Sequence, residues 1–393
     1  MMSRTMTRAL MVTVILSCIG VASGCTYRGK SVPYRDLSGP FFKKDIGCTI
    51  YFVFHPEHET EGLKRYIHPI SDLYAIEPDG KLERQYVPND KVWVLDFALS
   101  DYQYPIIIWD GGTRINILEN RDQVKNSFSA NWFYMEAVPP VGEKALVVTV
   151  PPNQEVSANI LAAIDLTSGE FVFTAETPWD FTDWSCGGVD TGLRNVLAMH
   201  KAKEGSYDKE MRTWWEPYLF HLDDEHKLTY KMIQFPPPEP KGENEVIMIP
   251  NDGRIIGVTH DGQTARFYQS LPPYDESTLL LSLKIPPVEI KAYNRDGSKL
   301  CLAGATEGSN HHYRILDMHS GRIVELFVSG KEIIWGLVAL SPKGDRLAAL
   351  IISVNGPGNR RFTFSVYDTL SGELIDSAEW PYKGSIYPMK VGY

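Results

Sequence analysis

The chain has 393 residues, of which 43% are hydrophobic and 22% are charged. These are the fractions of ordinary globular proteins, so they exclude an intrinsically disordered or a collagen-like chain. Lysine and arginine number 39 against 49 aspartate and glutamate residues, which gives a formal net charge of −10. This acidic balance argues against a nucleic-acid partner, because nucleic-acid phosphates attract basic surfaces.

The first 24 residues have the pattern of an export signal. Arg4 and Arg8 precede an uncharged stretch of 16 residues, 9–24, that ends in small residues. A basic start, an apolar middle and a small-residue end are typical of a secretory signal peptide. The stretch is shorter than the roughly 20 apolar residues that a membrane-spanning helix needs.

The segment VASGC (21–25) resembles the lipobox of bacterial lipoproteins. The resemblance implies that residues 1–24 are a signal peptide and that Cys25 is acylated. It also implies a cell-envelope location on the extracytoplasmic face of a membrane, and the outer membrane if the source is Gram-negative, because Thr26 follows the cysteine. The alternative is an ordinary cleaved signal in which Cys25 is incidental.

Residues 25–47 then form the lipidated N-terminus and a tether, whose turn-forming residues suit a flexible connection. Two or more acyl chains hold a protein at a membrane without any spanning helix. Removing the signal takes away two arginines and no acidic residue, so the net charge changes from −10 to −12.

The rest of the chain, 48–393, repeats two phrases with a period of about 50 residues. The first phrase is an apolar strand, a glycine turn and a second apolar strand, at 246–259, 290–305 and 337–352. The second is a strand ending in aspartate, a Ser-Gly turn and another strand, and its aspartates are Asp165, Asp317 and Asp368. Alternating β-branched and aromatic residues favour strands, and these turns favour hairpins. The aspartates are interpreted as structural acceptors for turn amides.

Two phrases make four strands, and repeated four-stranded units of this length predict a β-propeller. Innermost strands are expected to begin near Val92, Trp132, Trp184, Glu245, Val288, Trp335 and Ser385. These starts predict an all-β protein with a single propeller of seven four-stranded blades. The C-terminal strand, 385–391, is expected to complete the N-terminal blade built from 48–87. The phrases LSPKGDRLAALI and VYDTLSGELIDS resemble WD40-like and YVTN-like propeller repeats, which specify a fold and no activity.

A candidate binding face is formed by loops that this class of propeller places on one side. One expected loop covers 177–184 and another covers 201–217. Exposed aromatic side chains suit the recognition of a protein or a glycan, although they can equally pack the loop against its own blade. The candidate residues are Trp179, Trp184, Trp214, Trp215, His311, His312, Arg360 and Arg361.

The sequence contains no nucleophile elbow, P-loop or dinucleotide-binding motif. We expect no metal or other cofactor, because metal-ligand spacing and the periodic tryptophans of quinone-binding propellers are missing. Cys48, Cys186 and Cys301 allow at most one disulfide. We therefore expect a lipid-anchored binding or scaffold module with a protein or glycan partner. The alternative is a propeller hydrolase or lyase that acts on sugars or lactones at the cell envelope.

Overall fold

Short runs of β-branched and aromatic residues between glycine turns form every regular element that is described. The computed structural model describes residues 40–56, 71–86, 94–100, 103–110, 114–129, 133–134, 144–149, 160–179, 184–204, 212–233, 245–305, 311–328, 333–354 and 360–393, apart from 166, 169, 191, 226, 262 and 383. These residues contain no helix and fall in one compact unit, Leu37–Glu57 with Tyr66–Tyr393. Residues 1–39 lie outside the description, and with them the expected signal peptide and Cys25.

The described strands pair into seven antiparallel sheets of four strands each. The sheets are numbered in chain order, and the strands of each sheet are given from the innermost to the outermost. Sheet 1 comprises β28 (Gly384–Gly392), β1 (Thr49–Pro56), β2 (Asp72–Ile76) and β3 (Leu82–Tyr86), and sheet 2 comprises β4 (Val94–Ser100), β5 (Gln103–Asp110), β6 (Arg114–Asn120) and β7 (Gln123–Ser129). Sheet 3 comprises β8 (Phe133–Tyr134), β9 (Lys144–Thr149), β10 (Ile160–Asp165) and β11 (Phe171–Glu176). Sheet 4 comprises β12 (Trp184–Val189), β13 (Asn195–Glu204), β14 (Arg212–Leu222) and β15 (Leu228–Met232). Sheet 5 comprises β16 (Glu245–Met248), β17 (Ile255–His260), β18 (Ala265–Ser270) and β19 (Thr278–Leu283). Sheet 6 comprises β20 (Val288–Tyr293), β21 (Lys299–Ala305), β22 (His311–Asp317) and β23 (Ile323–Val328). Sheet 7 comprises β24 (Ile333–Leu340), β25 (Arg346–Val354), β26 (Arg360–Asp368) and β27 (Leu374–Glu379).

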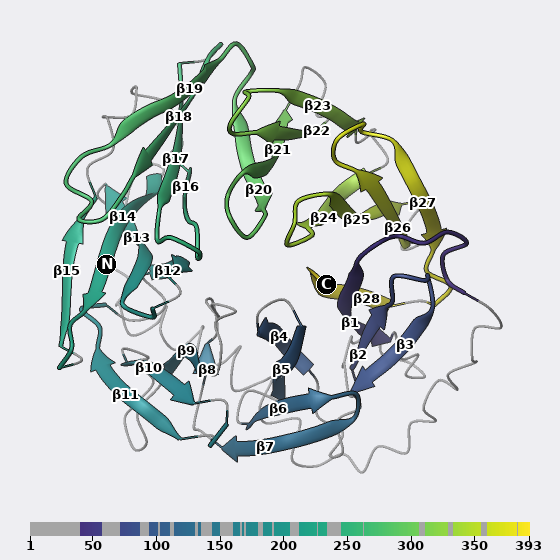
Figure 1. The fold of residues 1–393 in the computed structure, drawn as a ribbon, viewed down its shortest axis with the longest axis horizontal. Helices are drawn as coiled ribbons and strands as arrows, with labels where there is room; N and C mark the ends of the chain where they lie inside the picture. The colour runs from purple at the N-terminus through teal and green to yellow at the C-terminus, as the bar shows by residue number, and fades with distance from the viewer. Residues whose placement is uncertain are drawn as a thin grey trace, which may run out of the picture. The chain divides into compact units, whose positions relative to one another are not determined.

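The sheets are arranged around a common centre as in a β-propeller, with the first strand of each inside and the last at the rim (Figure 1). The innermost strands begin within two residues of the starts expected from the repeat. The C-terminal strand β28 pairs antiparallel with β1, with Ile50 opposite Val391. That pairing is the one predicted for 385–391.

Buried side chains fill the seams between successive sheets. Apolar clusters join sheets 1 and 2, 3 and 4, 4 and 5, 5 and 6, and 6 and 7. Between sheets 7 and 1, the ring of Phe52 lies 4.8 Å from that of Phe364 and 5.1 Å from that of Trp380. Each seam removes apolar surface from water, and this burial stabilises the fold by roughly 25 cal/mol per Å² of apolar surface.

The packed part of the chain begins before the expected boundary at residue 48. Phe42 and Ile46 are buried, and their backbone amides donate to the carbonyls of Gly80 and Pro78 in the β2–β3 turn. The expected tether therefore ends near residue 40, because the following residues are fixed by apolar burial and by hydrogen bonds to sheet 1.

The repeated aspartates act as the structural acceptors that the sequence predicted. Asp317 Oδ1 accepts the amides of His319 and Ser320, and Asp368 Oδ1 accepts those of Leu370 and Ser371. The bonds from Ser320 and Ser371 are the main reason why the pKa of each carboxyl lies below its ordinary value. Each aspartate carboxylate therefore holds the backbone of the turn that follows it in one conformation.

Register shifts recur in the outer strand pair of six sheets. Six of the seven described rim strands, β3, β7, β11, β19, β23 and β27, have at least one irregularity against their neighbour. The exception is β15, whose five residues pair with β14 without interruption. Bulges disrupt the regular ladder and protect edge strands from pairing with another chain.

A close approach between sheets 6 and 7 yields a stability prediction. Gly372 has φ +79°, and a Cβ there would lie 2.5 Å from the carbonyl oxygen of Glu325 in the preceding sheet. Gly321 occupies the same turn position one repeat earlier with φ +69°, but its nearest atom would be 3.5 Å away. We expect Gly321→Ala to cost about 1–2 kcal/mol from backbone strain alone. Gly372→Ala should cost at least about 1 kcal/mol more, because Cβ collides with backbone. Urea unfolding measures both, and equal losses would contradict the close approach.

His260 lies at the seam between sheets 5 and 6, where we expect it to make stability depend on pH. The side chain is buried, and Nε2 lies 2.9 Å from the carbonyl oxygen of Val288 on β20. Burial lowers the pKa of the imidazole, although that bond and the charge of Asp261 oppose the shift. The unfolded chain therefore takes up the proton more readily as pH falls through about 6.5, the ordinary histidine value.

We expect the free energy of unfolding to fall with decreasing pH in this range, and His260→Gln to remove part of that fall. Glutamine retains an N–H donor for Val288 but does not titrate. Denaturant unfolding of both proteins from about pH 7 to about pH 5 measures the difference. Parallel pH profiles would show that His260 does not contribute.

Candidate functional site

Most residues expected in binding loops lie on strands instead. The predicted loop at 201–217 is largely hairpin, because β13 extends to Glu204 and β14 begins at Arg212. Trp214 pairs with Ala202 and Trp215 with Lys201, so both lie within β14. Trp184 is the first residue of β12 and pairs with His200. The alternation of polar and apolar residues was too weak in 201–217 to reveal these longer strands.

The histidine and arginine pairs also begin strands. His311 and His312 open β22, and Arg360 and Arg361 open β26. Arg361 is exposed, and its Nε lies 3.6 Å from an exposed carboxyl oxygen of Glu379, an arrangement that contributes little stability. These pairs belong to sheets 6 and 7, whereas the tryptophans belong to sheet 4 or precede it. The expected residues are therefore distributed over three sheets.

Trp179 alone among the expected tryptophans has a described side chain, and it contacts residues that the sequence analysis did not single out. It follows β11 and packs against strands of sheet 4. Its indole lies 4.3 Å from the His200 ring at an interplanar angle of 21°, and 4.6 Å from the Tyr218 ring at 69°. Tyr230 meets it at 5.5 Å and 60°. We call Trp179, His200, Glu216, Tyr218 and Tyr230 the Trp179 cluster.

Strand register explains how sheet 4 assembles this cluster. His200 pairs with Glu216 across β13 and β14, and Phe220 pairs with Tyr230 across β14 and β15. Glu216, Tyr218 and Phe220 occupy alternate positions of β14, which share one face of a sheet. Trp179 then covers this face and packs against the apolar cluster between sheets 3 and 4.

The polar atoms of the cluster belong to an imidazole, a carboxylate, two phenol groups and an indole N–H. His200 Nδ1 lies 3.7 Å from Glu216 Oε2, and both side chains are partly exposed. Burial, followed by the charge of Glu216, raises the pKa of Tyr218, so its hydroxyl remains protonated at neutral pH. Partly exposed aromatic rings beside a carboxylate and an imidazole provide a surface for binding.

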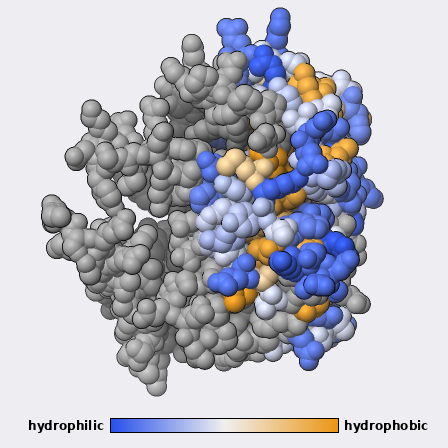
Figure 2. Space-filling model, turned by 90° about the vertical axis from the view of Figure 1, so that its left-hand side faces the viewer, coloured by the Kyte–Doolittle hydropathy of each residue, from blue (hydrophilic) through white to orange (hydrophobic). Residues whose placement is uncertain are grey.

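The outward end of the cluster lies on the rim strand β15. Tyr230 is 52% exposed, and Met232, two residues further along the same strand, is 48% exposed. On the side of the molecule that carries β15, the described surface is mainly hydrophilic, with small hydrophobic patches (Figure 2). The exposed side chains of Tyr230 and Met232 therefore stand out from surroundings that are mainly hydrophilic.

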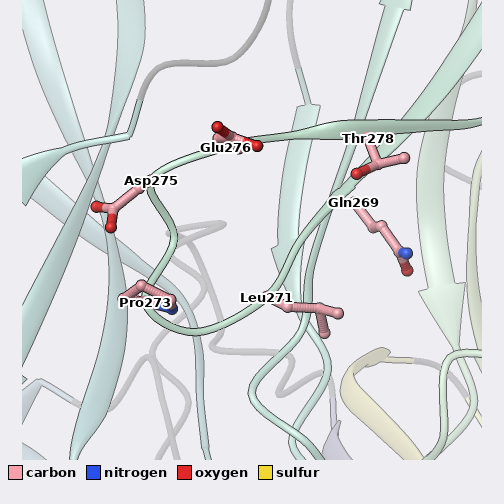
Figure 3. Close-up of a pocket in the computed structure, with 6 residues that line it drawn as sticks. All are labelled: Gln269, Leu271, Pro273, Asp275, Glu276 and Thr278. Atoms are coloured by element: carbon pink, nitrogen blue, oxygen red, sulfur yellow. The ribbon is translucent and has the colours of Figure 1, made fainter.

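A hollow of about 380 Å³ lies along the loop between β18 and β19, next to Lys231 of β15. Its lining residues are Gln269, Leu271, Pro273, Asp275, Glu276 and Thr278. Figure 3 shows these side chains spread along the loop rather than gathered around one point. Asp275 accepts a hydrogen bond of 2.7 Å from Lys231 Nζ, so its carboxylate is already engaged. The hollow therefore lacks the converging polar groups of a small-molecule site.

Cysteine and metal chemistry are limited in the described residues. Cys48 and Cys301 are free and buried, and burial raises the pKa of each thiol to about 12. Such thiols stay protonated and unreactive at neutral pH. Within the described ranges, no three His, Cys, Asp or Glu residues are placed to hold a metal ion. No helix among these residues is long and apolar enough to cross a membrane.

The chain matches no protein-family model and no curated protein. Among solved structures it is similar to TolB from Acinetobacter baumannii, with 14% identity, a TM-score of 0.47, and coverage of 88% of this chain and 67% of that one. The β-propeller domain of Cps50 (Swd1) from Myceliophteria thermophila has 11% identity, a TM-score of 0.49, and coverage of 74% and 88%. An oligogalacturonate lyase in complex with manganese has 14% identity, a TM-score of 0.49, and coverage of 72% and 79%. At these identities the similarity concerns the fold alone.

Proposed function

We propose that the protein is a lipid-anchored, extracytoplasmic propeller that binds a protein partner at the Trp179 cluster and the adjoining rim strand β15. One observation carries the binding proposal. β15 is the described rim strand without a register shift, and it presents Tyr230 and Met232 to solvent. A regular edge strand can accept an added strand, and aromatic and methionine side chains are enriched in protein interfaces.

The charge of this surface also favours a protein over an anionic polymer. The cluster contains Glu216, and Lys231 of β15 is held by Asp275 of sheet 5. A glycan partner is the second candidate, because aromatic rings and a carboxylate also suit sugar recognition. The enzyme alternative, a hydrolase or lyase, requires converging acidic or histidine side chains at the central opening. The Trp179 cluster instead faces sheet 3.

We also propose that the seven sheets are the blades of one closed ring. Support comes from the β28–β1 pairing and from apolar contacts between sheets 7 and 1. Residues 1–24 would be the signal peptide and Cys25 the lipidated residue. The lipobox-like segment supports this anchoring.

The binding proposal predicts a selective loss of partner capture. Wild-type protein, Tyr230→Ser/Met232→Ser and the control Leu279→Ser should be used as bait against detergent-solubilised envelope proteins. Leu279 is 49% exposed on β19, a rim strand with a register shift. We expect a partner that wild type and control retain and the double variant loses. Since Tyr230 also contacts the Trp179 ring, thermal unfolding of all three baits separates a loss of stability from a loss of capture.

Two outcomes would contradict the protein-binding proposal. One is equal capture by all three baits. The other is binding of an isolated envelope polysaccharide that depends on Tyr230 and Met232 while no protein is captured, which would favour the glycan candidate.

The anchoring proposal predicts fatty-acid incorporation at one residue. Cells that express the full chain should incorporate a labelled fatty acid into the wild-type protein, and Cys25→Ser should abolish the label. Loss of both the acyl group and its membrane attachment follows from removing the only thiol in the lipobox-like segment. Equal labelling of the two proteins would refute lipidation at Cys25.

A further inference from the structure

The described chain begins at the rim, beside the hairpin of β26 and β27. The ring of Phe41 lies 5.7 Å from that of Phe364 and 6.0 Å from that of Trp380. The backbone amides of Lys43 and Lys44 both donate to Asp376 Oδ2 on β27, at 2.6 and 2.9 Å. Figure 1 shows this first segment, in purple, passing between β3 and β27. A tether from Cys25 therefore reaches the propeller at this seam.

The turn of the same hairpin and the first residue of β27 present exposed apolar side chains. Leu370 is 64% exposed, the largest fraction among the large hydrophobic side chains that the structure describes, and Leu374 is 49% exposed. The equivalent turn positions of the other two Ser-Gly repeats, two residues after the aspartate, are Thr167 and His319. The copy beside the tether is thus the one that has leucine where its counterparts have polar residues.

Hydrogen bonds hold Leu370 in this exposed position. Its amide donates to Asp368 Oδ1 at 2.9 Å, and its carbonyl accepts a bond of 3.2 Å from Arg322 Nη2 in the preceding sheet. The turn is therefore fixed at both ends of this residue. A hydrophobic side chain on a fixed turn loses little backbone freedom when it meets an apolar environment.

The charges around the turn nearly balance. Lys43 and Lys44 are exposed at the chain entry, and Asp45 and Glu373 are exposed nearby in the same segments. The carboxylate of Asp376 is engaged by two amides. Attraction to an anionic surface is consequently weak, and the leucines are the groups that would favour contact with lipid.

The tether keeps this surface close to the membrane. Fifteen residues separate the start of the mature chain from the first described residue, counting from Cys25 to Gly39. Fully extended they span at most about 54 Å, and as a flexible coil about 20 Å on average. The tether gives the protein a high effective concentration at the membrane surface. A contact with lipid that is too weak to hold an untethered protein can therefore form.

We infer that the turn carrying Leu370 and Leu374, flanked by Lys43 and Lys44, rests on the lipid bilayer when the tether holds the protein at a membrane. The inference depends on the proposed anchoring and adds the surface that contacts the lipid. It commits the rim at sheets 7 and 1 to the membrane. The Trp179 cluster, on sheet 4, remains for the partner.

The test uses the mature chain with a histidine tag in place of Cys25, attached to phosphatidylcholine vesicles that contain a nickel-chelating lipid. Cys186 is changed to serine, and the buried Cys48 and Cys301 are retained. A polarity-sensitive fluorophore is attached at Leu370→Cys, and at Thr167→Cys and His319→Cys as matched controls. We expect the emission of the label at position 370 alone to move to shorter wavelength on attachment. Adding Leu374→Ser should reduce the shift.

The inference is overturned if position 370 responds no more than positions 167 and 319. Because the vesicles hold the protein through the tag, this result is independent of acylation. Absence of fatty-acid labelling at Cys25 would refute the anchor, and an unresponsive position 370 would refute the contact surface. Circular dichroism of each labelled protein shows whether it is folded, so a misfolded variant is not counted as either outcome.

Discussion

Burial between neighbouring sheets is the interaction on which the rest of the protein depends. A four-stranded sheet has two faces that need covering, and the apolar clusters described above cover them only if sheets stand side by side. The seam of sheets 7 and 1 differs from the others because it also joins the two ends of the chain. There Phe52, Phe364 and Trp380 pack together, and β28 completes the sheet begun by β1.

The architecture could be derived from the sequence because it repeats. The period of about 50 residues placed the innermost strands within two residues, and the aspartates before Ser-Gly turns were correctly interpreted. Both features depend on local chemistry: alternation for the strands and side-chain acceptors for the turns. The early packing of Phe42 could not be predicted, because two adjacent phenylalanines and one isoleucine in a short polar segment give no periodic signal.

The candidate site was harder to derive, since it depends on contacts between distant residues. Trp179 was selected as an aromatic residue in a loop, but its partners His200, Tyr218 and Tyr230 come from three strands. Their meeting depends on register, and the composition of 201–217 suggested a loop where β13 and β14 continue. The same error placed Trp214 and Trp215 outside the sheet.

The regularity of β15 has a consequence for assembly. If an outside strand pairs with the described rim, β15 is the uninterrupted site available to it. One such site on the described rim of each molecule permits a single added strand, or a symmetric pair of copies joined edge to edge. It does not permit growth in two directions, which requires a second edge on each copy. Copies that join through this strand would therefore stop at pairs instead of polymerising into sheets or fibres.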